Sequence, residues 1–391
     1  MRTGKLLPKN SGLSKLFVAF FESEKAGGLV LVGCTILSLL IANSSFGPAY
    51  QEFWHHKIAG EGIEHWINDG LMAIFFLMIG LELEREVYQG ELSNLKNALL
   101  PVSGALGGML VPAAIYAFFN AGTPTASGTG IPMATDIAFA LGILSLLGNR
   151  VPTSLKIFLT ALAVIDDLGA ILIIALFYSK GILLTNLLIS LGIFGVLLVL
   201  NRLKVHNLIP YLVGGVAMWY FMLHSGVHAS ITGVLLAFAI PFGDGSEKTA
   251  SSILQHALHN PVAFVILPLF ALANTAIVIG SGWYAPVMQP LGAGIIAGLS
   301  LGKPLGILLF SWLAVKTRLS PLPGDINWKY IAGAGLLGGI GFTMSIFITL
   351  LAFDNEQTID KAKIMVLIAS VLSGIAGFLV LKWASVTDKN Q

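Results

Sequence analysis

The sequence predicts an all-α integral membrane protein with about twelve transmembrane helices. Of the 391 residues, 55% are hydrophobic and 11% are charged, whereas a water-soluble domain carries roughly 25% charged residues. Apolar segments near the ~20 residues that span a bilayer recur along the whole chain. No alternating pattern of a β-barrel appears, so each segment is expected to be a helix that satisfies its own backbone groups. The segments lie near 26–44, 66–83, 97–119, 132–147, 155–178, 182–200, 208–223, 225–241, 262–279, 290–315, 329–353 and 362–381.

The distribution of lysine and arginine predicts that both termini are cytoplasmic, because cytoplasmic loops carry the excess of these residues. Seventeen of the 22 basic residues, Arg2, Lys5 and Lys9 among them, fall on that side and Lys303 lies within a helix. The outer loops contain Lys57, Lys180, Lys361 and Lys363. The polar connections reach about 20 residues at most, too few to build a core. We therefore expect a single transmembrane domain over residues 1–391.

Ionisable residues inside a membrane are costly, so they face a bundle interior or a water-filled cavity and mark ion pathways. This chain has few of them. They are Asp69, Glu82, Asp136, Asp166, Asp167 and Lys303, with His228 as a further candidate.

Asp166 and Asp167 are the most informative pair, since they are adjacent in the middle of an apolar segment. Neighbouring residues lie about 100° apart on a helix, so both can line one cavity. Removal from water and mutual repulsion favour the protonated forms, while carboxylate oxygens are also ligands for small hard cations. Competition between proton and cation at one site is sufficient for coupled exchange. The alternative is a structural pair that neighbouring donors hold in place.

Lys303 lies well inside segment 290–315, too deep for its ammonium to reach the interface easily. We expect it to pair with an aspartate or to neutralise a helix end. Buried lysines can lose their proton near physiological pH, so a role in carrying a proton and a purely structural ion pair both remain open.

Two segments are predicted to be interrupted helices. Pro132 precedes Thr135 and Asp136, and proline disfavours a regular helix there. Residues 338–345 are rich in glycine and then polar. Interrupted helices in the two halves of a transporter point to its binding site, where Asp136 could balance positive helix ends and Lys303 negative ones. The alternatives are close helix packing for the glycines and simple helix capping for Asp136.

Four further polar residues have both a functional and a structural interpretation. Asp69 lies near the outer interface and belongs to an ion pathway or caps the helix. Glu82, near the inner end of the same helix, draws cations into a funnel or lies on a solvated helix end. His228, placed in helix 8, responds to pH or is a hydrogen-bonded core residue. His256 contributes to a pH response or lies on the surface, and it lacks partners for a metal site.

Several classes of protein are disfavoured by what the sequence lacks. There is no Walker loop, Rossmann glycine pattern or nucleophile elbow, so no enzymatic activity and no cofactor are expected. A net charge of +2 does not suggest a nucleic-acid partner. The single cysteine, Cys34, allows no disulfide or thiolate metal site.

Seven strings of residues together resemble the NhaA-type sodium/proton antiporters of the bacterial inner membrane, over about residues 26–382. The strings are Ala26–Gly28, Trp66–Asp69, Ala134–Ala140, Ile165–Ala170, Ser225–His228, Gly302–Gly306 and Gly341–Phe347. The resemblance implies electrogenic exchange of Na+ or Li+ for a larger number of protons, in the service of pH homeostasis. It also implies two inverted repeats, helices 3–5 over 95–178 and helices 10–12 over 290–384, with helices 4 and 11 unwound and crossing near the midplane.

The same resemblance assigns roles to individual residues. Asp166 and Asp167 bind the cation and the proton, and Lys303 pairs with Asp166. Thr135 and Asp136 line the crossing of the unwound helices. The remaining assignments are Asp69 to the outward path, Glu82 to the cytoplasmic mouth, and His228 and His256 to the pH response. Na+, Li+, H+ and membrane lipid are the implied partners, with a homodimer as a further candidate.

Two departures from the family and two rival functions qualify this reading. Gln255 stands where a well-known member of the family has a glutamate of its pH sensor, which affects the pH threshold. The outer loop 45–64 is shorter than the loop that forms a dimerising hairpin there, which weakens the inference of a dimer. A sodium-coupled solute symporter would need an arginine or aromatic cluster for its substrate, and an intramembrane aspartyl protease a Gly-x-Gly-Asp string; neither is seen.

Overall fold

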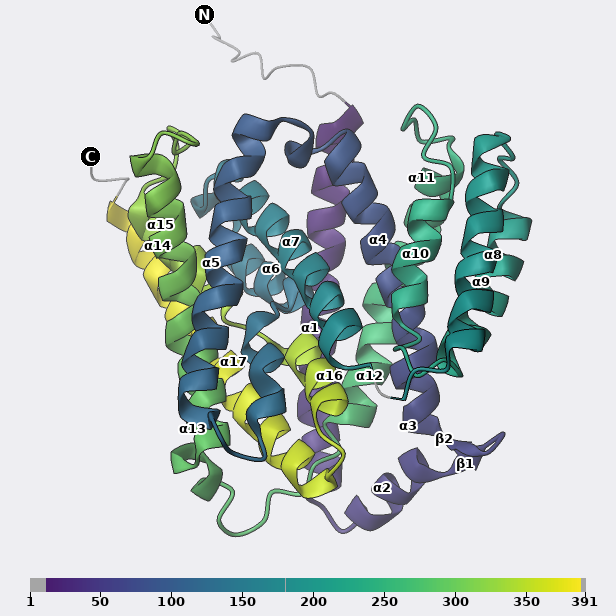
Figure 1. Cartoon of the computed structure of the whole chain (residues 1–391). Helices are drawn as coiled ribbons and strands as arrows, with labels where there is room; N and C mark the ends of the chain where they lie inside the picture. Colours follow the sequence, from purple (N-terminus) through teal and green to yellow (C-terminus); the bar gives the residue numbers. More distant parts are fainter. Residues whose placement is uncertain (1–11, 180, 388–391) are drawn as a thin grey trace, which may run out of the picture.

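The computed structural model describes residues 12–179 and 181–387, which form a bundle of helices (Figure 1). Helix α1 begins and α17 ends at the top of Figure 1, here called the upper face, and α2 and a short hairpin lie at the opposite, lower face. The α-helices are α1 (Gly12–Ala42), α2 (Gly47–His55), α3 (Ile63–His65), α4 (Met72–Tyr88), α5 (Leu95–Asn120), α6 (Ile137–Leu146), α7 (Thr153–Phe177), α8 (Leu184–Arg202), α9 (Leu208–Leu223), α10 (Ile231–Ala239), α11 (Ala250–Pro261), α12 (Leu267–Asn274), α13 (Pro290–Ala297), α14 (Lys303–Lys316), α15 (Trp328–Gly338), α16 (Phe342–Ala352) and α17 (Glu356–Thr387).

Shorter elements interrupt or join these helices. Three π-helical turns are continuous with longer helices: η1 (Trp66–Leu71), η5 (Val262–Ile266) and η7 (Gly298–Gly302). The 3-10 helices are η2 (Glu91–Ser93), η3 (Ala126–Met133), η4 (Gly148–Arg150) and η6 (Ala285–Met288). The strands β1 (Lys57–Ile58) and β2 (Glu61–Gly62) form an antiparallel hairpin.

The all-α membrane fold is confirmed, and each of the twelve predicted segments contains a helix. Within the described residues, eight helical runs are long and apolar enough to span a membrane. The number rises to ten if two bent pairs each form one span: α1 with α2, bent by 115°, and α15 with α16, bent by 44°. Helix α9, with 16 residues, and α10, with nine, fall below that length.

Two predicted boundaries are wrong for identifiable reasons. Gly226 takes a positive φ of 80°, so segment 225–241 becomes helical only at Ile231, and His228 lies in the turn before α10 rather than within a helix. The polar connection 242–260 contains a helix, because Thr249 caps α11 by accepting a hydrogen bond from the Ser252 amide. The basic residues Arg2, Lys5 and Lys9 lie outside the described residues.

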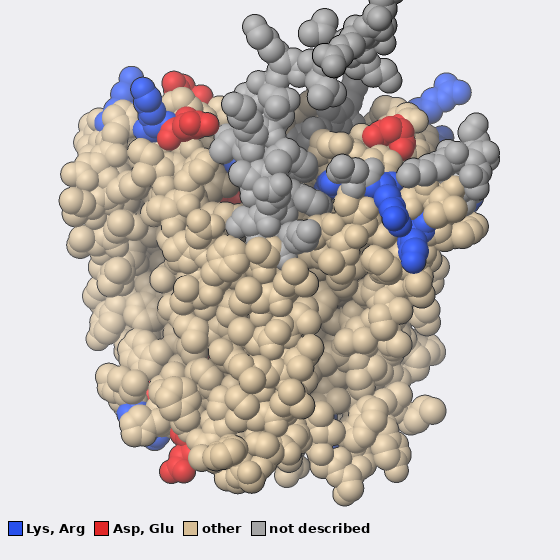
Figure 2. Space-filling model, turned by 180° about the vertical axis from the view of Figure 1, so that it is seen from behind, with Lys and Arg blue, Asp and Glu red and all other residues tan. Residues whose placement is uncertain are grey.

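The distribution of charged and apolar side chains on the surface is that of a protein that crosses a membrane several times. Figure 2 shows Lys, Arg, Asp and Glu near the upper and lower ends of the face it displays, with a broad band of other residues between them. Large apolar side chains such as Leu176, Leu188 and Val216 are more than half exposed. Such a band is stable in contact with lipid and unfavourable in water.

Glycines allow helices α5 and α14 to approach closely. A Cβ atom on Gly107 would lie 2.1 Å from the Gly306 carbonyl oxygen, and one on Gly306 would lie 2.0 Å from the Gly107 carbonyl oxygen. Small residues of this kind let helix backbones pack directly within a membrane. The contact joins α14, which begins at Lys303, to α5, the first helix of the predicted repeat 95–178.

We expect Gly107→Ala to destabilise the protein, because the new methyl group must displace backbone. Overpacking costs about 1–3 kcal/mol, more than the ~1 kcal/mol that alanine gains over glycine in a helix. Gly192→Ala in α8 is the control, since a Cβ there meets no atom within 4 Å. Thermal unfolding in detergent should give a lower Tm for Gly107→Ala and an equal or higher Tm for Gly192→Ala. Equal Tm values for the two variants would contradict the close contact.

Candidate functional site

The two interrupted helices meet at their breaks. Residues 134–136 separate η3 from α6, and residues 339–341 separate α15 from α16. The Asp136 amide donates to the Ile340 carbonyl at 2.7 Å, and the Thr135 hydroxyl donates to the Gly338 carbonyl at 2.9 Å. Each break therefore satisfies backbone groups of the other, as irregular backbone buried in a membrane protein requires.

Asp136 serves both of the roles considered from the sequence. Its Oδ1 accepts from the Phe139 amide at 2.9 Å, which caps α6. Its Oδ2 accepts from the Thr343 amide at 3.0 Å and from the Thr343 hydroxyl at 2.6 Å, which joins α6 to α16. Both carboxylate oxygens are thus engaged by donors at the crossing.

Lys303 and Asp166 form a fully buried ion pair. The Lys303 Nζ lies 2.9 Å from Asp166 Oδ2, and both side chains are 0% exposed. Lys303 also donates to the Met133 carbonyl, which ends η3. The same Asp166 oxygen lies 2.7 Å from the Thr135 hydroxyl, whose single proton is shared between this carboxylate and the Gly338 carbonyl. The lysine therefore compensates both an aspartate and the carboxyl end of a short helix, as the depth of Lys303 in its segment predicts.

Three carboxylate oxygens of the aspartate pair remain open. Asp166 Oδ1, Asp167 Oδ1 and Asp167 Oδ2 are buried and accept no hydrogen bond from the described residues. Buried polar atoms are rarely left without a partner, because their loss of hydration is then uncompensated. Neighbouring donors therefore hold one oxygen of Asp166, whereas among the described residues none holds Asp167. The open oxygens fit a proton or a small hard cation.

The described residues contain no group of three or more His, Cys, Asp or Glu side chains placed to hold a metal ion. A cation at the aspartate pair would therefore complete its shell with hydroxyl, carbonyl or water oxygens.

Asp69 belongs to a separate cluster and does not cap a helix. It lies inside the π-helical turn η1, with Oδ2 3.2 Å from His65 Nε2 and Oδ1 3.7 Å from His228 Nε2. The His228 ring packs against Phe347 of α16 with centroids 5.5 Å apart, and its Nδ1 lies 3.2 Å from the Ser230 hydroxyl. The sequence analysis did not single out His65, although its spacing of four residues from Asp69 on one helical face indicates the contact.

Two glutamates near the upper face are buried. Glu82 is 5% exposed, so its interpretation as a solvated helix end is wrong. Glu84, which the sequence analysis did not select, is 6% exposed and accepts from the Ser251 hydroxyl of α11 at 3.3 Å. His256, also on α11, is exposed, with Nδ1 2.7 Å from the Ser252 carbonyl. No hydrogen bond or ion pair among the described residues joins Asp69, Glu82 or His256 to the aspartate pair.

Comparison with known proteins identifies the family of the chain. The sequence model of the family named Na+/H+ antiporter 1 matches residues 18–381. The Na(+)/H(+) antiporter NhaA of Flavobacterium psychrophilum is 66% identical over 95% of this chain and 97% of its own length. The corresponding protein of Dechloromonas aromatica is 61% identical over 97% of this chain and 98% of its own length.

A solved structure shares the fold at a greater evolutionary distance. The sodium proton antiporter MjNhaP1 of Methanocaldococcus jannaschii superposes with a TM-score of 0.50 at 15% identity, covering 94% of this chain and all of that one.

We expect Thr343→Val to destabilise the crossing of the interrupted helices, because it removes the hydroxyl that donates to buried Asp136. A lost bond to a buried charged group costs about 1–3 kcal/mol. The control is Thr349→Val in the same helix, since the similarly buried Thr349 hydroxyl donates, within the described part of the chain, only to the Ser345 carbonyl one turn away. Thermal unfolding in detergent should give the lower Tm for Thr343→Val. A larger loss for Thr349→Val would contradict the role assigned to Thr343.

Proposed function

The chain belongs to the Na+/H+ antiporter 1 family and is a Na+/H+ antiporter, and on this premise we propose that cation and protons compete for Asp166 and Asp167. The observation that supports this site is the set of three buried carboxylate oxygens with no donor. Membership of the family favours exchange over the symporter and the protease considered as alternatives.

The competition follows from charge. With both aspartates ionised and Lys303 protonated, the site carries one net negative charge, which one Na+ or Li+ neutralises. A proton on Asp167 neutralises it equally well, so cation and proton exclude each other there. A second proton leaves with cation binding if Asp166, or Lys303, also deprotonates. Two protons then move against one cation, and the exchange is electrogenic.

Access to the site would alternate through movement of the crossing as a unit. The repeats 95–178 and 290–384 each supply one interrupted helix, and the hydrogen bonds at the crossing join them. We place the upper face in the cytoplasm of a bacterial cell and the chain in its inner membrane. Glu82 and Glu84 then line the cytoplasmic mouth, while Asp69 belongs to the outward path.

Two further assignments concern regulation and assembly. His228 and His256 would contribute to the pH response, His228 through its contact with Asp69. The loop 45–64, although short, contains the β1–β2 hairpin at the lower face (Figure 1). It offers a strand edge through which a second copy of the chain could pair.

We expect Asp167→Asn to abolish sodium-dependent proton movement, because a neutral amide cannot titrate near neutral pH and so cannot alternate between a protonated and an anionic form. The measurement uses everted membrane vesicles in which added Na+ dissipates a pH gradient reported by an acridine dye. Asp325→Asn is the control, since Asp325 is exposed in the connection before α15 and has the same substitution. Activity of Asp167→Asn equal to that of the control, at equal protein amounts, would exclude the proposed site.

We also expect pH to change the apparent KM for Na+ and not the maximal rate. Where protons occupy the site, mass action requires the apparent KM to rise, per unit of pH decrease, by up to about tenfold for each proton that cation binding displaces. Proteoliposomes measured at several Na+ concentrations across a pH series provide the test, with the same internal and external pH in each. A pH-independent KM with a falling maximal rate would indicate a separate inhibitory proton instead of competition.

A further inference from the structure

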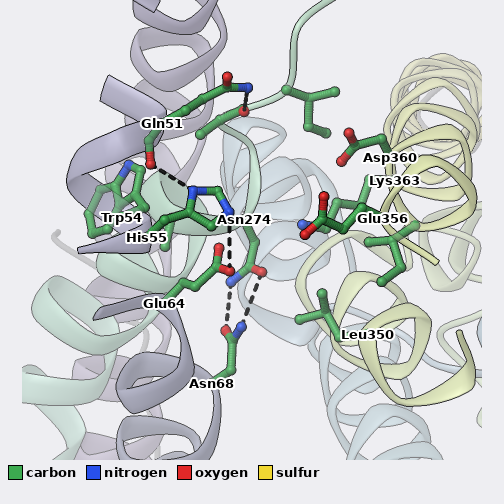
Figure 3. A pocket seen from close by; sticks show the side chains of 14 residues that line it. Gln51, Trp54, His55, Glu64, Asn68, Asn274, Leu350, Glu356, Asp360 and Lys363 are labelled. Atoms are coloured by element: carbon green, nitrogen blue, oxygen red, sulfur yellow. Dashed lines mark hydrogen bonds and ion pairs between the residues drawn. The ribbon is translucent and has the colours of Figure 1, made fainter. Parts of the chain in front are cut away.

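A polar cavity of about 340 Å³ opens at the lower face, away from the aspartate pair. Figure 3 shows residues of α2 and α3 on one side of it and residues of α17 on the other. The residues that matter here are His55, Glu64, Asn68, Asn274, Glu356, Asp360 and Lys363. The cavity thus lies between the N-terminal helices and the predicted repeat 290–384.

One side and the floor of the cavity are held by hydrogen bonds and an ion pair. His55 Nε2 lies 3.6 Å from Glu64 Oε1. The side-chain amides of Asn68 and Asn274 form two hydrogen bonds with each other (Figure 3). Asn274 Nδ2 donates to Asn68 Oδ1 at 2.7 Å, and Asn68 Nδ2 donates to Asn274 Oδ1 at 3.4 Å. Asn68 directly precedes Asp69, so the floor of the cavity adjoins the cluster assigned to the outward path.

The opposite side presents an ammonium group without a direct partner. Lys363 is 7% exposed and lines the cavity. Among the described residues, its Nζ takes part in no ion pair within 4.0 Å and in no hydrogen bond. Asp360 and Glu64 are the two acidic residues that interact with it electrostatically. A lysine buried to this degree normally pairs directly with a carboxylate, since burial of the charge is otherwise costly.

We propose that this cavity is an external vestibule for a small inorganic cation, in which the positive charge of the Lys363 ammonium keeps the binding of that cation weak. Glu64, Glu356 and Asp360 line the cavity with carboxylate oxygens, and Asn68 and Asn274 line it with amide oxygens, the chemical types that hard cations prefer. Among the described residues these side chains are not placed to hold a metal ion as one group, so they attract a cation through their charge. Three carboxylates and one lysine leave the vestibule with a net charge of −2 when His55 is neutral, which attracts cations.

Lys363 would help the vestibule to release the transported cation to the outside. A cation that leaves the aspartate pair would be retained by an exit lined only with carboxylates. The tethered ammonium lowers the attraction of the carboxylates for a second positive charge, so the departing Na+ is not trapped and external Na+ does not accumulate. The inference rests on the proposed transport function and its direction.

The test measures inhibition of transport by external Na+. Right-side-out membrane vesicles are loaded with Na+ and a trapped pH dye, placed in a more acidic medium, and followed for sodium-driven proton entry at increasing external Na+. Lys363→Met removes the tethered charge, so the external Na+ concentration that halves the rate should fall by about fivefold, as one nearby charge in a wet cavity predicts. Lys361→Met is the matched control, because Lys361 lies two residues away on α17 and is exposed. Its half-inhibitory concentration should equal that of the wild type.

A second variant keeps the test decisive if Lys363→Met does not fold. Asp360→Asn, at an exposed residue, removes a carboxylate and should raise the half-inhibitory concentration. Equal values for Lys363→Met and Lys361→Met would overturn the proposal, and so would no change in Asp360→Asn. Absence of sodium-driven proton entry in the wild type would instead refute the proposed function itself.

Discussion

The hydrogen bonds between the two interrupted helices are the constraint on which the rest of the structure depends. A helix that ends inside a membrane leaves amide and carbonyl groups that lipid cannot satisfy. Here the Asp136 amide meets the Ile340 carbonyl and the Thr135 hydroxyl meets the Gly338 carbonyl. Thr135 also donates to Asp166, so the break that requires the crossing also places a donor against the ion pair. The geometry of the site is therefore a consequence of how the backbone is satisfied.

The number of hydrogen-bond donors divides the buried acids into different roles. Asp136 accepts from donors at both oxygens and acts as a structural link. Asp166 has one oxygen engaged by Lys303 and Thr135 and one that is open. Asp167 has none engaged. Each donor stabilises the ionised form of a carboxylate. Asp167 has no such donor, so its negative charge is the one that most requires neutralisation by a proton or a cation.

The sequence allowed the site to be predicted more fully than its surroundings. Adjacent aspartates in an apolar segment, a deep lysine and a proline before Asp136 are local signals, and the structure brings these residues together. Buried Glu84 accepts a hydrogen bond from Ser251 of α11, a helix that the sequence analysis placed in a polar connection because it contains Ser, Gln, His and Asn residues. The cavity residues Glu64 and Lys363 lie almost 300 positions apart, so only the folded chain reveals their common setting.

The two buried lysines illustrate how distance to a carboxylate can separate binding from release. Lys303 lies within direct contact of Asp166, where it cancels one of the two charges of the aspartate pair. In the proposed mechanism the other charge is neutralised by the transported ion. Lys363 faces several carboxylates without contacting one, so it lowers the attraction of the whole cavity without closing it. A transporter needs both arrangements, because a path that attracts a cation equally at every point would also slow its departure. Selective binding at the centre therefore requires weaker binding at the exit.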